Sequence, residues 1–307
     1  MLPTIAIAIL IRHVRPFHKI LLHGGISFLL TIATFITVAP YVFLDFNAWR
    51  SSTIYEGSLA TGNIAVFYTR QFIETAPILF QLERILPYAL GPVMLVFGLL
   101  GLLGVLVNLV RKPKSPMLML VLAFLLLFIP NAFLFAKWTR FIAPTFPFFA
   151  IFAVIFLAML SKKAKTTSLL LGAILVITTM LWSFAFFSMY LRQDIRVEAS
   201  KWLESNVVPA SSFLVEGGNM VDLPLKGNYQ KVSLDFYNLE SDPQVRSKIV
   251  DTLVTSDYFL VQSRRVFMNH ERLPHLFPKT ARFYDALFAG ELGFIKVQEF
   301  HSYPSLG

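Results

Sequence analysis

The sequence contains no cysteine, which excludes disulfide bonds, thiolate metal sites and cysteine nucleophiles. It also lacks GxGxxG, the P-loop, GxSxG and an Asp-x-Asp pair, so nucleotide-binding and hydrolase functions have no support. The histidines, at positions 13, 18, 23, 270, 275 and 301, do not show the spacing of a metal site. No metal site and no cofactor is therefore predicted, while the metal requirement of the protein stays open.

Charge is scarce as well, at 15% of the residues against 56% hydrophobic ones, and the mean hydropathy is +0.64. This composition is typical of a polytopic membrane protein surrounded by membrane lipids. The net charge of +9 comes from residues 1–189, which hold 14 Lys and Arg but 4 Asp and Glu, whereas residues 190–307 are nearly balanced. Positive charge in a membrane region sets topology, so a nucleic-acid partner is not expected.

Long apolar runs are the main feature that is present. A helix crosses a bilayer with about 20 apolar residues. The sequence predicts five full transmembrane helices plus an N-terminal partial one, Leu2–Ile11, which looks like the end of a crossing whose beginning is missing. The full crossings are placed near Ile20–Leu44, Leu86–Val110, Met117–Ala136, Phe141–Leu160 and Ser168–Met189.

The short loops 11–19, 111–114 and 161–165 are rich in Lys and Arg and are predicted to be cytoplasmic. The loop Asp45–Arg84, the segment 137–140 and everything after Met189 are then predicted to lie outside. The three glycines Gly98, Gly101 and Gly104 favour close packing against a neighbouring helix, and Pro130 should kink the third full crossing.

After the last crossing the pattern changes to alternating helices and strands. Helices are predicted at 194–207, with Asp194 as N-cap, at 242–256 with a proline in the first turn, and from 281 to near Gly290. Strands are predicted at 211–217, at 257–263 and after Gly290. The fold class is therefore an α-helical membrane domain, residues 1–189, followed by a small extracytoplasmic α/β domain, residues 190–307.

Two cations, Lys137 and Arg140, stand on the predicted outer face, where the charge rule disfavours them. A lipid phosphate would favour them there, because arginine offers a planar fork for phosphate oxygens and lysine adds a point charge. The alternative is that both side chains reach the interface without a ligand while Trp138 anchors the helix. Pro144 and Pro147 suit a helix start whose backbone groups face a cavity.

The charged residues of the Asp45–Arg84 loop are mostly expected to be solvated, although Glu56 or Glu74 could approach Arg140. Arg264 and Arg265, directly after a predicted strand, are expected to form surface salt bridges rather than to hold an acidic ligand.

Several stretches together resemble a family. "RFIAPTFPFFAI" is similar to the Arg-aromatic-x-x-Pro-x-x-Pro helix start of polytopic GT-C glycosyltransferases, the protein-mannosyltransferase and aminoarabinose-transferase-like group. "TAPILFQLERILPYALGP" resembles the preceding passage of such proteins. "DIRVEASKWLESNVVPAS", "DYFLVQSRRVF" and "FYDALFAGELGFIKVQEFHSYP" resemble parts of their C-terminal extracytoplasmic region.

The resemblance implies transfer of a sugar, with inversion, from a polyprenyl-phosphate carrier to a protein or lipid acceptor on the outer face of a bacterial or archaeal cytoplasmic membrane. It implies that Arg140, and more weakly Lys137, contacts the carrier phosphate. The acidic catalytic loop of that family lies near its N-terminus and has no counterpart here, so the chain looks like the C-terminal portion of such an enzyme and no catalytic base is assigned. A non-catalytic membrane partner that binds a lipid-linked sugar is the alternative. A transporter ranks last, because no repeat is evident and the crossing centres carry no Lys, Arg, Asp or Glu.

Overall fold

The computed structural model describes residues 17–113, 115–217, 223–262 and 264–306. Its chain divides into two compact units, one that ends at Trp182 and one that begins at Ser183. The division falls inside helix α10 (Lys165–Leu191), which also contains the boundary predicted at 189/190. The partial helix predicted at Leu2–Ile11 lies outside the described residues.

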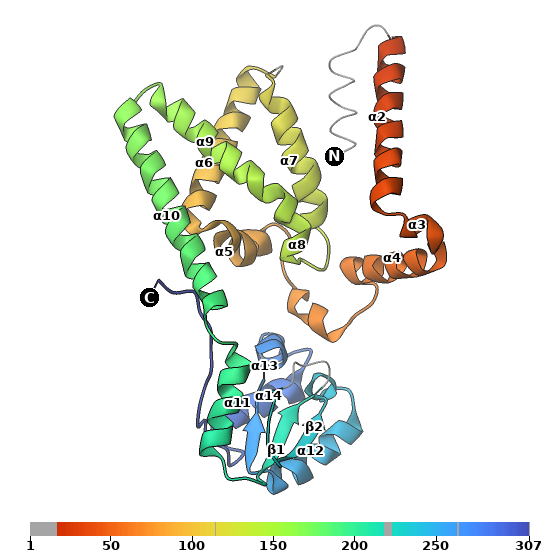
Figure 1. The fold of residues 1–307 in the computed structure, drawn as a ribbon, viewed down its shortest axis with the longest axis vertical. Helices are drawn as coiled ribbons and strands as arrows, with labels where there is room; N and C mark the ends of the chain where they lie inside the picture. The colour runs from red at the N-terminus through yellow and green to blue at the C-terminus, as the bar shows by residue number, and fades with distance from the viewer. Residues whose placement is uncertain (1–16, 114, 218–222, 263, 307) are drawn as a thin grey trace. The chain divides into compact units, whose positions relative to one another are not determined.

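The first unit is helical throughout its described part (Figure 1). Its elements in chain order are α2 (Phe17–Val38), α3 (Tyr41–Leu44), α4 (Phe46–Thr61), the 3-10 helix η1 (Phe67–Phe72), the π-helical turn η2 (Gln81–Ile85), α5 (Leu86–Leu90), α6 (Pro92–Arg111), α7 (Met117–Ala132), α8 (Thr139–Ile142), the 3-10 helix η3 (Ala143–Thr145), α9 (Phe146–Ser161) and most of α10.

Four helical stretches of the described residues are long and apolar enough to cross a membrane: His18–Val38, Pro92–Arg111, Thr139–Ser161 and Lys165–Leu191. The third predicted crossing, Met117–Ala136, is shorter than expected, because α7 ends at Ala132. It ends soon after Pro130, where the Asn131 amide donates to the Leu127 carbonyl and the Gln81 amide donates to the terminal Ala132 carbonyl. These side chains satisfy carbonyls at the helix end, so Pro130 precedes a stop rather than a kink in a long helix.

The first predicted crossing also ends early, at Val38 instead of Leu44, since Pro40 interrupts the backbone hydrogen bonds of the helix. The segment expected to be the Asp45–Arg84 loop is instead largely helical, with α4, η1 and η2 inside it. Asp45 caps α4 by accepting a hydrogen bond from the Ala48 amide at 3.1 Å.

Within the predicted crossing Leu86–Val110, the helix is broken at Gly91, which has a φ of +81° and separates α5 from α6. Glycine is required there for a second reason, because an added Cβ would lie 3.1 Å from the Trp182 side chain. The indole of Trp182 in turn donates to the Tyr88 carbonyl at 3.0 Å, so this break is also a packing point for α10.

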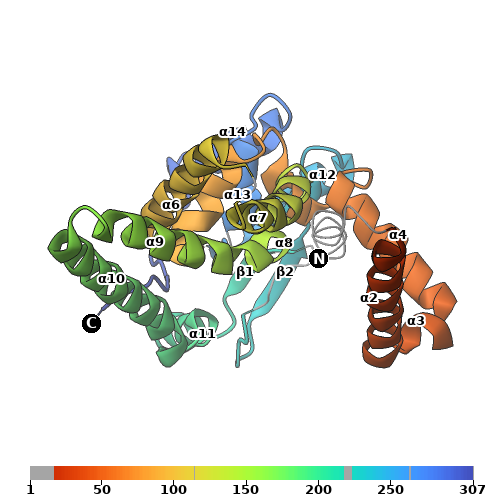
Figure 2. The ribbon, with the colours of Figure 1, turned by 90° about the horizontal axis from the view of Figure 1, so that it is seen from above.

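The predicted packing role of Gly98, Gly101 and Gly104 is confirmed. Helix α9 runs beside α6 in both views (Figures 1 and 2). A Cβ on Gly98 would lie 2.9 Å from the Phe149 ring, and a Cβ on Gly101 would collide with the Phe152 carbonyl group. The glycines therefore allow the two backbones to approach closely, which is a common way for membrane helices to associate.

The second unit contains a small parallel sheet and its helices. Its elements after α10 are α11 (Ile195–Asn206), β1 (Ser212–Glu216), β2 (Gln230–Leu234), the 3-10 helix η4 (Phe236–Asn238), α12 (Pro243–Thr255), β3 (Tyr258–Leu260), α13 (Arg264–Glu271) and α14 (Pro278–Phe288). The helices predicted at 194–207 and 242–256 and the strand at 211–217 are confirmed in kind and position, and the strand predicted at 257–263 is confirmed only over Tyr258–Leu260.

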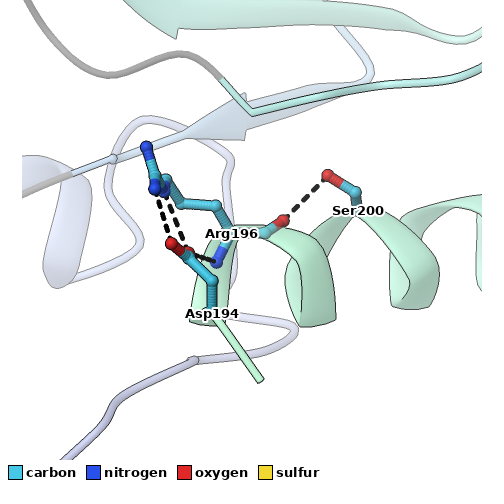
Figure 3. Close-up of polar contacts among 3 residues, drawn as sticks. All are labelled: Asp194, Arg196 and Ser200. Atoms are coloured by element: carbon cyan, nitrogen blue, oxygen red, sulfur yellow. Dashed lines mark hydrogen bonds and ion pairs between the residues drawn. The ribbon is translucent and has the colours of Figure 1, made fainter. Parts of the chain in front are cut away.

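The predicted N-cap of α11 is also confirmed. The Asp194 carboxylate accepts from the Arg196 amide at 2.9 Å and from the Arg196 Nε at 2.9 Å (Figure 3). One turn further, the Ser200 hydroxyl donates to the Arg196 carbonyl at 2.8 Å. The Asp194 bond satisfies an amide at the helix start that would otherwise lack a partner, and the Ser200 bond adds to the helix's own backbone bonding.

The strand order is β2-β1-β3, and both pairings are parallel. The central strand β1 has four of its five residues buried, whereas β2 is exposed at four of five positions. In β2, Val232 and Leu234 alternate with polar residues, a pattern typical of a strand, so sequence reasoning missed this strand although its pattern was visible.

For the described residues near the C-terminus, one predicted strand is wrong and one helix was missed. No strand forms after Gly290, because Gly290 and Gly293, with φ values of +79° and +82°, turn the chain away and leave 294–300 without strand pairing. Helix α13 was not predicted and begins at Arg264. The pair Arg264–Arg265 thus starts a helix rather than following a strand end directly, and Arg264 donates to the Tyr303 hydroxyl. The expectation of surface salt bridges for this pair stays a prediction.

Candidate functional site

The start of the α8–α9 span is built from three short pieces rather than one regular helix. Thr139–Ile142 is α-helical, Ala143–Thr145 is a 3-10 turn, and α9 continues from Phe146. Pro144 lies in the 3-10 turn and Pro147 in the first turn of α9, where a missing N–H disturbs the helix least. The Thr145 hydroxyl donates to the Ile142 carbonyl at 2.6 Å, so a side chain replaces part of the hydrogen bonding that is interrupted here.

Arg140 projects from this start and keeps its charged group at the surface. Its Cζ atom lies 4.4 Å from the centre of the Trp138 ring and 5.4 Å from that of Phe141. The side chain is nevertheless 64% exposed. The two rings therefore orient the guanidinium through cation–π contact without covering it, and its N–H groups stay available to an anion.

One carboxylate lies close to this guanidinium. Glu56, from α4, places its Oε2 3.8 Å from the Arg140 Nη2, and both side chains are more than half exposed, at 59% and 64%. An exposed ion pair at this distance is worth only about 0–1 kcal/mol. Glu56 therefore lies beside Arg140 without fixing it, so that another anion has little to displace.

Aromatic side chains from two further segments extend the site. The Trp138 ring lies 6.1 Å from Tyr68 and 5.8 Å from Phe72, both in η1. Tyr68 is hydrogen-bonded to Tyr55 of α4, and its pKa is raised by partial burial and then by that bond. Its hydroxyl therefore stays protonated at neutral pH, so it can donate a hydrogen bond.

We call this group of five residues, Tyr55, Glu56, Tyr68, Trp138 and Arg140, the Arg140 site. It joins α4, η1 and the α8–α9 start through an additional backbone bond from the Ala136 amide to the Ala60 carbonyl, at 3.1 Å. Gly62 follows α4 with a φ of +83° and packs against Phe135, so the end of α4 is held against this segment.

Lys137 has different surroundings from Arg140. It is 5% exposed, and its Nζ donates to the Phe135 carbonyl at 3.3 Å. Burial lowers the pKa of its ammonium group, because removal from water disfavours the charged form. Of the two predicted phosphate contacts, Arg140 therefore has its charged group at the surface, whereas Lys137 is directed into the protein.

Among the acidic residues that were considered, the structure brings Glu56 to Arg140. Glu74 lies in the turn after η1 with a φ of 55°. The approach of Glu56 results from α4 and the Ala60–Ala136 contact, and no spacing in the sequence signals it. The same holds for the Tyr55–Tyr68 pair, which sequence reasoning did not identify.

In the described part of the chain, no group of three or more His, Asp and Glu residues is arranged to hold a metal ion. The chain was also compared with known proteins. No protein-family model, curated protein or solved structure matches it. The proposals below therefore depend on the residues of this chain and on the family resemblance of its motifs.

Proposed function

We propose that the chain is the C-terminal portion of a membrane glycosyltransferase, and that the Arg140 site binds the phosphate of a polyprenyl-phosphate sugar. The observation that carries the proposal is the exposed Arg140 guanidinium, oriented by Trp138 at the start of a helix able to cross a membrane. A lipid-linked anion presents its phosphate at the membrane interface, where this helix start is expected to lie. The resemblance of "RFIAPTFPFFAI" to the GT-C helix start supports the same assignment.

The chemistry of the site suits a phosphate with an attached sugar. The planar guanidinium can donate two parallel hydrogen bonds to phosphate oxygens, and such charge-assisted bonds are worth about 1.5–3 kcal/mol each. The free energy of these bonds exceeds that of the weak ion pair between Glu56 and Arg140, so phosphate would displace the Glu56 carboxylate from Arg140. The Tyr55–Tyr68 pair and Glu56 would then face the sugar hydroxyls on the other side of the site.

Glu56 is the carboxylate that this arrangement offers for catalysis. In an inverting transfer, the acceptor oxygen forms a bond to the anomeric carbon while the bond from that carbon to the phosphate oxygen breaks. The acceptor proton passes to a carboxylate, and the leaving group is the carrier phosphate. We propose that Glu56, whose exposed side chain is not fixed by Arg140, turns to the face of the sugar opposite the phosphate and takes this proton there.

The proposal is tested with the full chain in liposomes that contain polyprenyl phosphate. Because the Arg140→Ala variant loses both charge-assisted bonds, it should bind the carrier about 100-fold more weakly or worse. Arg50→Ala, which removes an exposed arginine from α4, is the matched control and should bind as the parent chain does. Equal carrier binding by parent and Arg140→Ala chains would show that this site does not bind the phosphate.

The Glu56→Gln variant separates catalysis from binding. It should keep or modestly improve carrier binding, by up to about fivefold, because an exposed competitor for Arg140 is removed. Transfer of a radiolabelled sugar by the parent chain, together with its loss in Glu56→Gln, would identify the carboxylate as the base. Carrier binding by the parent and Glu56→Gln chains, with no transfer by either, would instead favour the non-catalytic carrier-binding partner.

A further inference from the structure

The second unit contains a polar cluster that the proposed function does not use. Its strand order, β2-β1-β3, matches the beginning of the doubly wound order 2-1-3-4-5. In such sheets ligands bind beyond the carboxyl ends of the strands, at the point between β1 and β3 where the winding reverses. Here Glu216 ends β1, and Gln262 follows the end of β3 by two residues.

Glu216 is completely buried at this edge. Its Oε2 accepts from the backbone N–H of Gln262 at 3.1 Å, and its Oε1 accepts from the Tyr284 hydroxyl of α14. Burial, followed by the neighbouring Glu216 carboxylate, raises the pKa of Tyr284 well above its usual range, so its hydroxyl keeps its proton. A buried carboxylate is costly and is usually retained where its hydrogen-bonding capacity is needed.

Polar atoms without partners lie on the two segments that hydrogen-bond to this carboxylate. The Nε2 and Oε1 atoms of Gln262 and the hydroxyl of Thr280 are enclosed, and no hydrogen-bond partner for them exists in the described part of the chain. Thr280 precedes Tyr284 by one helical turn of α14, so the two side chains point from the same face of that helix. Each enclosed polar group without a partner costs about 1–3 kcal/mol, so their presence on both segments that contact Glu216 is informative.

We propose that this edge, formed by Glu216, Gln262, Thr280 and Tyr284, binds a small neutral ligand rich in hydroxyl groups, of the sugar class. The Glu216 carboxylate accepts from hydroxyls, while the Gln262 amide and the Thr280 hydroxyl both donate to and accept from them. The same carboxylate repels phosphates and other anions.

Entry to this edge involves Gln262. The residue as a whole is half-buried, whereas both polar atoms of its side chain are enclosed. The amide head is thus turned inward while other parts of the residue reach the surface. A ligand reaches the carboxylate when this side chain turns, and the amide then gains the partners it lacks.

The test measures sugar binding to the full chain in detergent. Glucose, mannose, galactose and N-acetylglucosamine are titrated by calorimetry, and the thermal midpoint is followed with each. At least one of these sugars is expected to bind and to raise the midpoint. Gln262→Met, which keeps the size of the side chain but removes the amide, should weaken that binding by about tenfold or more, as should Glu216→Gln.

The Gln262→Met variant should also fold at least as stably as the parent without ligand, because it removes enclosed atoms that lack partners. Loss of its sugar binding therefore would not reflect unfolding. Gln230→Met, an exposed position at the other end of the sheet, is the control and should bind normally. Arg140→Ala should bind the sugar normally too, which separates this site from the proposed transferase site.

Two results would overturn the proposal. One is that none of the four sugars binds or raises the midpoint at millimolar concentration. The other is that binding is the same in the parent and Gln262→Met chains, which would mean that the enclosed amide is satisfied by ordered water alone.

Discussion

Asp194 joins two interactions at the first turn of α11. Its carboxylate accepts from the Arg196 side chain and from the Arg196 amide, and these bonds in that order lower its pKa from 3.8 to about 2. A carboxylate with a lowered pKa in the folded state contributes stability that is fully present above its unfolded pKa. That contribution is lost as the pH falls through the folded value.

We therefore expect the first turn of α11 to open more often as the pH is lowered from about 4 to about 2, because the carboxylate is then protonated. Hydrogen exchange at the Arg196 and Val197 amides, corrected for intrinsic exchange rates, measures this. In the Asp194→Asn variant the side chain still accepts a hydrogen bond but does not titrate, so the local change over this range should disappear. A parent chain whose opening is flat from pH 4 to 2 would contradict the assigned role.

The cap at Asp194 was predictable because all of its partners lie within two residues, and a capping side chain acts locally. The Arg140 site differs in this respect. Arg140 itself stood out by its charge at a helix start, but Glu56 and Tyr68 reach it through the path of α4 and η1, and that region was expected to be a loop. No local pattern encodes such a meeting of distant residues.

At the scale of elements, the most constrained contact is the one between α6 and α9. Gly101 is the closest point, since an added Cβ would meet the carbonyl group of Phe152, which is backbone and cannot turn aside. On α10, by contrast, a Cβ on Gly172 would lie 3.6 Å from a Leu157 methyl group, an ordinary contact distance.

Gly101→Ala should therefore destabilise the chain by about 1–3 kcal/mol, the usual range for overpacking, because α6 and α9 must separate. Gly172→Ala is the matched control and should be neutral or slightly stabilising, since alanine is the better helix former. Thermal unfolding of both variants in the same detergent measures the difference. If the Gly101→Ala variant unfolds at the same temperature as the parent chain, the two helices are not in the close contact described.

Where the sequence has a long apolar run, the presence of a helix was predicted correctly. The residues at which these helices end were not. The ends of α2, α7 and α5 depend on Pro40, on Asn131 with Gln81, and on Gly91 with Trp182. Of these, only the prolines and glycines are visible as breakers in the sequence. Gln81 and Trp182, which complete the ends of α7 and α5, come from other helices, so their effect appears in the structure alone.

At the scale of the whole molecule, the path across the membrane depends on α7. With 16 residues, this helix is about 24 Å long, somewhat less than the roughly 30 Å of a bilayer's hydrocarbon core. Local thinning of the bilayer accommodates a mismatch of this size at modest cost. The positive loops before α7 and before α10 favour a crossing, because only then do both lie on the cytoplasmic side.

The complete lack of cysteine makes this testable with single introduced cysteines and a membrane-impermeant thiol reagent. Cysteines replacing Lys112 and Lys163 should react from the cytoplasmic side, and those replacing Thr139 and Gln193 from the outside. All four positions are exposed, so differences in labelling report on sidedness rather than on burial. If Lys112 labels together with Thr139, α7 does not cross the membrane. If Thr139 labels from the cytoplasm, Arg140 faces the wrong leaflet, and a site for an outward-facing lipid-linked sugar at this helix start is excluded.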